Sequence, residues 1–184
     1  MARAEVTRAR ILAAAEELVL QDGVSRLTLE ATAAACGLSK GGVLYHFQTR
    51  DLLIEAMVER LVATFHAELD LAASGDHGAG LLARSYVRAS FTSAQPDGER
   101  QRVLGAALLA AMAAQPNLLR PLREDFEQLQ GRLEADGIDP VEATIARLAA
   151  DGIWLAELFG FADLTLDQRA AVRDRLLARL RAPE

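Results

Sequence analysis

Residues 28–47 decide the fold of this chain, and they read TLEATAAACGLSKGGVLYHF. Thr28 can cap a short helix that runs to about residue 35, and Ser39 can cap a second that ends near Phe47, because hydroxyl side chains accept hydrogen bonds from the free amides at helix starts. Gly37, between them, occupies a position that favours positive φ. Two helices joined by a short turn containing glycine are the signature of a helix-turn-helix.

The first turn of the second helix is unusual because it contains two glycines, Gly41 and Gly42. Each costs roughly 0.5–1 kcal/mol relative to alanine in a helix, but glycine also lets a backbone approach a partner closely. Lys40, the only lysine of the chain, precedes them, and the pair Tyr45-His46 follows. The pattern indicates a surface that meets phosphates.

Helical periodicity extends outward from this motif in both directions. Thr7 and the stop Asp22-Gly23 bracket an apolar stripe over residues 8–21, and Thr49 caps a helix over residues 50–73 with apolar side chains at every fourth position from Leu53 to Leu69. Asp151-Gly152 lies within a helical pattern. Further helices are predicted at about 80–94, 99–114, 117–135, 140–160 and 166–181. The chain is therefore predicted to be all-α, with about nine helices and no strand.

The charge of the chain is unevenly distributed. The formal net charge is −6, yet residues 1–50 carry +1 and the remainder −7, which suits a protein that touches DNA at one end only. The single cysteine, Cys36, excludes an internal disulfide and a cysteine-based zinc site and suits a reducing cytoplasm. The N-terminus has no signal-peptide core, and the longest apolar run, 106–114, is too short to span a bilayer.

Three stretches of residues 7–57 form a recognisable pattern: Arg10-Ile11-Leu12 with Ala14, Ala15 and Gly23, the whole of residues 28–47, and Thr49-Arg50-Asp51-Leu52-Leu53. In these stretches the chain resembles the TetR family of transcriptional regulators. The resemblance implies a three-helix helix-turn-helix DNA-binding domain over residues 1–48. It also implies a helical ligand-sensing and dimerisation domain over residues 49–184, linked to the first by the helix at 50–73.

The resemblance also implies which residues contact double-stranded DNA, with the second helix of the motif in the major groove. They are Thr28, Ser39, Lys40, Gly41, Gly42, Leu44, Tyr45, His46 and Arg50. Thr28 and Ser39 also serve as caps, and His46 could instead pack against the following helix. Position 42 often carries a base-reading side chain in the family but is Gly in this chain, and position 44 is often aromatic but is Leu here. Much of the sequence preference is therefore expected to come from backbone proximity and DNA shape.

The remainder is expected to hold an effector pocket and a dimer interface. Pocket candidates for an unknown, largely apolar effector are Phe65, Tyr86, Phe91, Met112, Phe126 and Trp154, each of which could also be plain core. Arg84, Arg88 and Arg123 could pair with an anionic ligand or form surface salt bridges. Homodimerisation is expected through the helices at 140–160 and 166–181, the first of which has a small-residue face of Ala146, Ala149, Ala150, Gly152, Ile153 and Ala156.

These features favour a cytoplasmic, homodimeric, ligand-responsive repressor that binds a palindromic operator. The alternative is a helical adaptor that has lost operator binding. A small helical enzyme would need a cluster of titratable residues, and the sequence contains no catalytic motif. No metal site is expected, because His66 and His77 are eleven residues apart with no further His and no Cys nearby, and no cofactor is expected.

Overall fold

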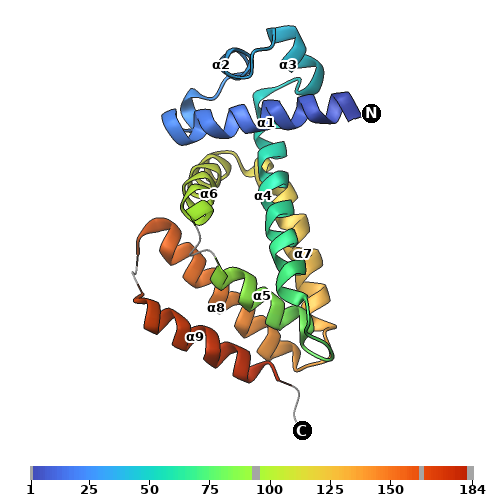
Figure 1. Ribbon diagram of the computed structural model, residues 1–184, viewed down its shortest axis with the longest axis vertical. Coiled ribbons are helices and arrows are strands. Elements are labelled where there is room, and N and C mark those ends of the chain that lie inside the picture. Colours follow the sequence, from blue (N-terminus) through green and yellow to red (C-terminus); the bar gives the residue numbers. More distant parts are fainter. Residues whose placement is uncertain (1, 93–95, 162–163, 182–184) are drawn as a thin grey trace. The chain divides into compact units, whose positions relative to one another are not determined.

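The computed structural model describes residues 2–92, 96–161 and 164–181, and these residues form helices and no strand, as predicted (Figure 1). The α-helices and two 3₁₀ turns follow in the order α1 (Ala2–Asp22), η1 (Val24–Arg26), α2 (Leu29–Ala35), α3 (Lys40–His46), α4 (Arg50–Ala73), α5 (Leu81–Thr92), α6 (Pro96–Ala114), η2 (Pro116–Leu119), α7 (Arg120–Glu134), α8 (Pro140–Phe159) and α9 (Leu166–Arg179).

The helix-turn-helix forms through the predicted caps. Thr28 Oγ1 accepts a hydrogen bond from the Ala31 amide at 3.0 Å, and Ser39 Oγ accepts one from the Gly42 amide at 3.1 Å. Gly37 closes α2 with φ of 65°, a left-handed conformation that glycine adopts without strain. The α2–turn–α3 prediction is therefore confirmed.

The predicted start of the first helix is wrong, because α1 begins at Ala2 rather than after Thr7. Thr7 is not a cap; it lies inside the helix, where its hydroxyl donates to the Arg3 carbonyl at 2.9 Å. A Thr side chain can bond the carbonyl four residues earlier in this way without ending a helix. Nothing in residues 2–6 breaks helical structure, so the helix continues back to Ala2.

The later helices match their predicted ranges to within a few residues. The main difference is that residues 116–119 form the 3₁₀ turn η2, so α7 begins at Arg120. Asp151-Gly152 lies within α8, as predicted. Residues 93 and 94, the expected end of the fifth helix, lie outside the described residues.

The chain folds into two compact units, each built from two separate segments. The first comprises residues 1–61 and 100–122, and the second residues 62–99 and 123–184. The predicted stripe of α4 serves both, because Leu53 and Met57 lie in the core of the first unit and Leu69 in the core of the second. The first core also contains Leu108 and Met112 of α6, so this distant helix belongs to the same core as the buried residues of the helix-turn-helix.

Candidate nucleic-acid interface

The helix α3 is held to the first unit by its apolar side. Val43 is fully buried, and Phe47, which ends the helix, is 3% exposed. Both belong to a core that includes Ile11 of α1 and Leu29 of α2. Because these anchors all lie on one side of a two-turn helix, its other side faces solvent.

The predicted DNA-contacting residues divide by exposure. Thr28, Ser39, Lys40, Gly41 and Tyr45 are exposed, and Tyr45 is 82% exposed. The half-buried members of the predicted set are Gly42, Leu44, His46 and Arg50. The structure therefore brings the start of α3 and its Tyr45 together on one open surface.

Tyr45 and His46 lie side by side at the end of this helix. Their rings meet edge to face with centroids 5.2 Å apart. A single exposed ring would rotate freely, and the contact with His46 restricts the Tyr45 ring. A phenol and an imidazole held in this way offer two hydrogen-bonding groups to a partner that approaches α3.

Neither glycine of α3 is required by the fold of this chain. Both have helical backbone angles rather than positive φ. A Cβ built on Gly41 would meet only Ser39 Oγ, at 3.9 Å, and one on Gly42 would meet Ser39 Oγ at 3.4 Å and Leu38 Cβ at 3.7 Å. Alanine would fit at both positions and would favour the helix. The glycines therefore serve to leave space for a partner that approaches α3 from outside the chain.

Lys40 is held on this surface by an acidic neighbour that the sequence analysis missed. Its Nζ lies 2.5 Å from Glu30 Oε1, and both side chains are more than half exposed. The hydrogen bond from Lys40 lowers the pKa of Glu30. An exposed pair of this kind contributes little to stability, so a phosphate can compete for the lysine. The available signal in the sequence was that Glu30 lies in the first turn of α2 and Lys40 in the first turn of α3.

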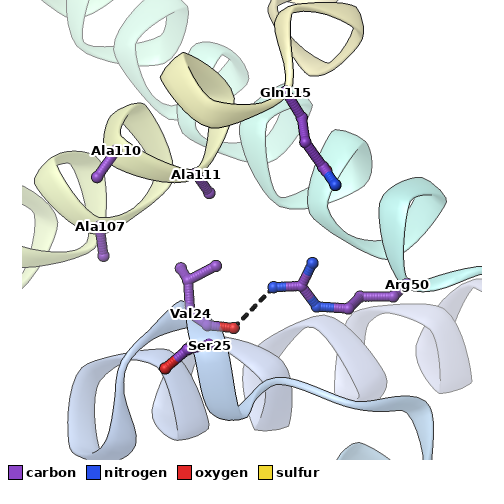
Figure 2. A pocket seen from close by; sticks show the side chains of 7 residues that line it. All are labelled: Val24, Ser25, Arg50, Ala107, Ala110, Ala111 and Gln115. Atoms are coloured by element: carbon purple, nitrogen blue, oxygen red, sulfur yellow. Dashed lines mark hydrogen bonds between the residues drawn. The ribbon is translucent and has the colours of Figure 1, made fainter.

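Arg50 has a structural role that was not predicted. Its Nε donates to the Leu27 carbonyl at 2.9 Å and its Nη2 to the Val24 carbonyl at 2.8 Å. The side chain thereby ties the start of α4 to the connection between α1 and α2, and it lines a cleft with residues of α6 (Figure 2). Phosphate contact by Arg50 stays a prediction.

The predicted effector residues are only partly gathered. Phe65 and Tyr86 meet edge to face at 5.3 Å, and both pack in the second core with Phe91. Met112 instead lies in the core of the first unit. Phe126 lies under the guanidinium of Arg147, 5.7 Å from its ring centroid, and Trp154 is half-buried on α8.

A buried polar network next to these aromatic residues was missed by the sequence analysis. The hydroxyl of Tyr86 donates to Asp151 Oδ1, whose other oxygen accepts from Arg147 at 2.8 Å. Burial raises the pKa of both Tyr86 and Asp151. Arg147 is held in turn by Gln130 Oε1 at 2.7 Å. The network gives a largely apolar region two fixed polar groups, Tyr86 and Asp151.

The arginines considered for an anionic ligand are partly engaged in ion pairs. Arg84 Nη2 and Arg88 Nη1 both contact Asp76, at 2.7 and 2.6 Å. Arg84 is almost fully buried and also donates to the carbonyls of Ala79 and Leu180. Together they fix the loop between α4 and α5 to the end of α9.

The small-residue face of α8 does not lie open, and this prediction is wrong for its main members. Ala146 and Ala150 are buried, and Ala149 and Ile153 pack against the same core beside α5. Small side chains let α5 approach closely, so the alanines serve packing within the chain. Only Gly152 of this set is fully exposed.

The face of α8 that lies away from Ala146 and Ala150, and that includes Gly152, carries an open apolar stripe. Its members are spaced alternately four and three residues apart and are Val141, Ile145, Leu148, Gly152, Leu155 and Phe159. Leu148 is 55% exposed and Phe159 47%, and Phe161 stacks on Phe159. Leu166, at the start of α9, is also open. This spacing is the seam pattern of packed helices.

The histidines form ordinary contacts. His66 Nε2 lies 2.6 Å from Asp125 Oδ1, and the described residues contain no group of three or more His, Cys, Asp or Glu arranged to hold a metal. Cys36 is half-buried, with its sulfur 3.6 Å from the Ala33 carbonyl. Among the described residues, no helix is both long and apolar enough to cross a membrane.

Comparison with known proteins agrees with this geometry. Residues 11–57 match the family of bacterial regulatory proteins of the tetR type, and residues 80–181 match the tetracyclin repressor-like C-terminal domain. The transcriptional regulator UidR of Escherichia coli is 27% identical over 124 residues, which span 65% of this chain and 59% of that relative. TtgR of Pseudomonas putida is 36% identical over 61 residues, covering 33% of this chain and 29% of TtgR.

Solved structures extend the likeness to nearly the whole fold. The multidrug binding protein EbrR, solved with ethidium, superimposes with a TM-score of 0.70 at 26% identity, over 95% of this chain and 97% of EbrR. SCO1917 of Streptomyces coelicolor, a TetR-family member, gives a TM-score of 0.74 at 23% identity, over 96% and 99% of the two chains. Because residues 11–57 and residues 80–181 both match, the chain belongs to the TetR family of bacterial transcriptional regulators and not to a family of enzymes.

Proposed function

We propose that this protein is a ligand-responsive repressor that binds a palindromic DNA operator as a homodimer. The observation that carries the proposal is the open start of α3, where exposed Lys40 and Gly41 are followed by half-buried Gly42 and the fold requires neither glycine. A helix start of this kind suits entry into the major groove.

On DNA, the residues of α3 divide into those that position and those that read. Lys40 and Tyr45 bind phosphates, and the free amides at the helix start add to this contact. Gly41 and Gly42 let the backbone approach the base edges. Because Gly42 has no side chain to read a base, the remaining preference comes from Leu44, His46 and the shape of the DNA.

The dimer is proposed to form through the open stripe of α8, together with α9. Two copies of the stripe would face each other across a two-fold axis and form a four-helix bundle. Because only about half of each side chain is exposed before association, burial of Leu148 and Phe159 would stabilise the dimer by roughly 1 kcal/mol for each side chain. Gly152, in the middle of the stripe, permits close approach of the two backbones.

The effector is proposed to be a largely apolar molecule that binds among the aromatic residues of the sensor domain. Phe65 and Tyr86 supply apolar surface, and the Tyr86–Asp151 bond supplies a polar anchor. That EbrR was solved with ethidium, a flat aromatic molecule, is consistent with this class. The effector would release DNA by binding one of two head spacings more tightly than the other. We place the protein in the cytoplasm, where its operator lies.

Salt-dependent binding tests the proposal. Fluorescence anisotropy with labelled duplex should show affinity that falls steeply with salt. Lys40→Ala should lower the salt slope by about one and weaken binding to all sequences alike, whereas Lys40→Arg keeps the charge and should keep the slope. Absence of any salt-dependent binding would contradict the proposal and favour an adaptor that has lost operator binding.

A further inference from the structure

A cleft in the first unit is bordered by η1, by the last turns of α6 and by the Arg50 side chain. It has a volume of about 390 Å³ and is lined by Val24, Ser25, Arg50, Ala107, Ala110, Ala111 and Gln115 (Figure 2). Sites for small molecules have volumes of roughly 300–1,000 Å³, so the cleft is large enough for one.

The cleft is polar at one end and apolar at the other. Ala107 and Ala111 are four residues apart and lie along one face of α6, and Gln115 directly follows the helix, where its backbone amide donates to the Ala111 carbonyl at 3.2 Å. Figure 2 shows Ala107 and Ala111 above Val24 of η1, with the side-chain ends of Gln115 and Arg50 to their right. An occupant must therefore combine an apolar body with a polar group.

The charge of the polar end selects an anion. Arg50 uses Nε and Nη2 for the two backbone carbonyls, and Nη1 has no hydrogen-bond partner among the described residues. The guanidinium is fixed in place by those two bonds, so Nη1 is already oriented. A carboxylate there would gain a charge-assisted hydrogen bond, and the Gln115 amide can donate a second.

We propose that this cleft binds a small molecule with a carboxylate head and an aliphatic body. The carboxylate pairs with Arg50 Nη1 and Gln115, and the hydrocarbon lies along Ala107, Ala111 and Val24. The site is distinct from the aromatic residues Phe65 and Tyr86, which belong to the other unit.

The experiment uses the full-length protein without DNA and straight-chain carboxylates from butyrate to octanoate. Calorimetry should show affinity rising about threefold to fourfold with each methylene that enters the cleft. Octanol and octylamine should bind at least tenfold more weakly than octanoate. In spectra of protein labelled at alanine methyl groups, octanoate should shift the signals of Ala107 and Ala111.

Two variants with a matched control locate the site. Ala111→Leu fills the apolar end, and Gln115→Glu places a like charge beside the carboxylate; each should weaken octanoate at least tenfold. Ala13→Leu adds the same bulk to an exposed position of α1 outside the cleft and should change nothing. Equal binding of octanol and octanoate, unshifted Ala107 and Ala111 signals, or unchanged affinity in both cleft variants would overturn the inference. Because no DNA is present, none of these results depends on the operator proposal.

Discussion

Replacing Gly41 with alanine should make the protein more stable and its DNA binding weaker. The backbone at Gly41 is helical, and the new Cβ would meet only Ser39 Oγ, at 3.9 Å, an ordinary contact. Alanine is favoured over glycine by roughly 0.5–1 kcal/mol in a helix. Since Gly41 lies in the first turn, where fewer amides are bonded, about 0.5 kcal/mol is the expected gain in unfolding free energy.

The opposite effect is expected on DNA. If the start of α3 lies against the duplex, an added methyl group holds the two backbones apart and strains every neighbouring contact. We expect a loss of at least tenfold in affinity, which corresponds to about 1.4 kcal/mol. Urea unfolding measures the first effect, and anisotropy at fixed salt measures the second.

Gly131→Ala is the matched control. Gly131 is an exposed glycine within α7, and a Cβ there would meet nothing within 4 Å. The variant should gain roughly 0.5–1 kcal/mol in stability with unchanged DNA affinity. If Gly41→Ala bound DNA as tightly as the wild type, or were less stable, the reasoning about the open start of α3 would be refuted.

Three further outcomes are expected. Glu30→Gln frees Lys40 from its ion pair, so affinity for DNA of any sequence should rise severalfold at low salt, by anisotropy, and a fall would count against phosphate binding by Lys40. Leu148→Asp should dissociate the dimer in sedimentation experiments, whereas Leu71→Asp, on an exposed part of α4, should not; a dimeric Leu148→Asp variant would exclude the stripe of α8 as the interface. The arginines Arg84 and Arg88 hold the pKa of Asp76 well below its usual value of 3.8, so Asp76 stabilises the fold above that pH and loses this contribution as the pH falls below it. Asp76→Asn should therefore cost about 2 kcal/mol in urea unfolding at pH 7 and less at pH 3, and an equal cost at both would be inconsistent with the ion pairs.

Local signals in the sequence were sufficient for the helix-turn-helix. The caps Thr28 and Ser39 and the turn residue Gly37 act within three or four residues, so their effect could be read directly. Thr7 shows the limit of this logic, because the same side chain that can cap a helix can also bond back to the Arg3 carbonyl inside one.

Packing between distant segments could not be predicted in the same way. An alanine face on α8 is compatible with either a second copy or the chain's own α5, and only the fold places Ala146 and Ala150 against α5. Met112 is apolar in either core, and the structure places it in the first. The bonds of Arg50 span more than twenty residues, so no local pattern indicates them.

Selection of bound duplexes from random sequence shows whether two copies of α3 bind DNA as a pair. The wild-type protein should enrich an inverted repeat whose half-sites lie about one helical turn, roughly 34 Å, apart or a multiple of that distance. The same selection with Leu148→Asp should lose the repeat and retain at most single half-sites. If the wild-type protein enriched no sequence, or single half-sites without symmetry, paired binding by α3 would be excluded.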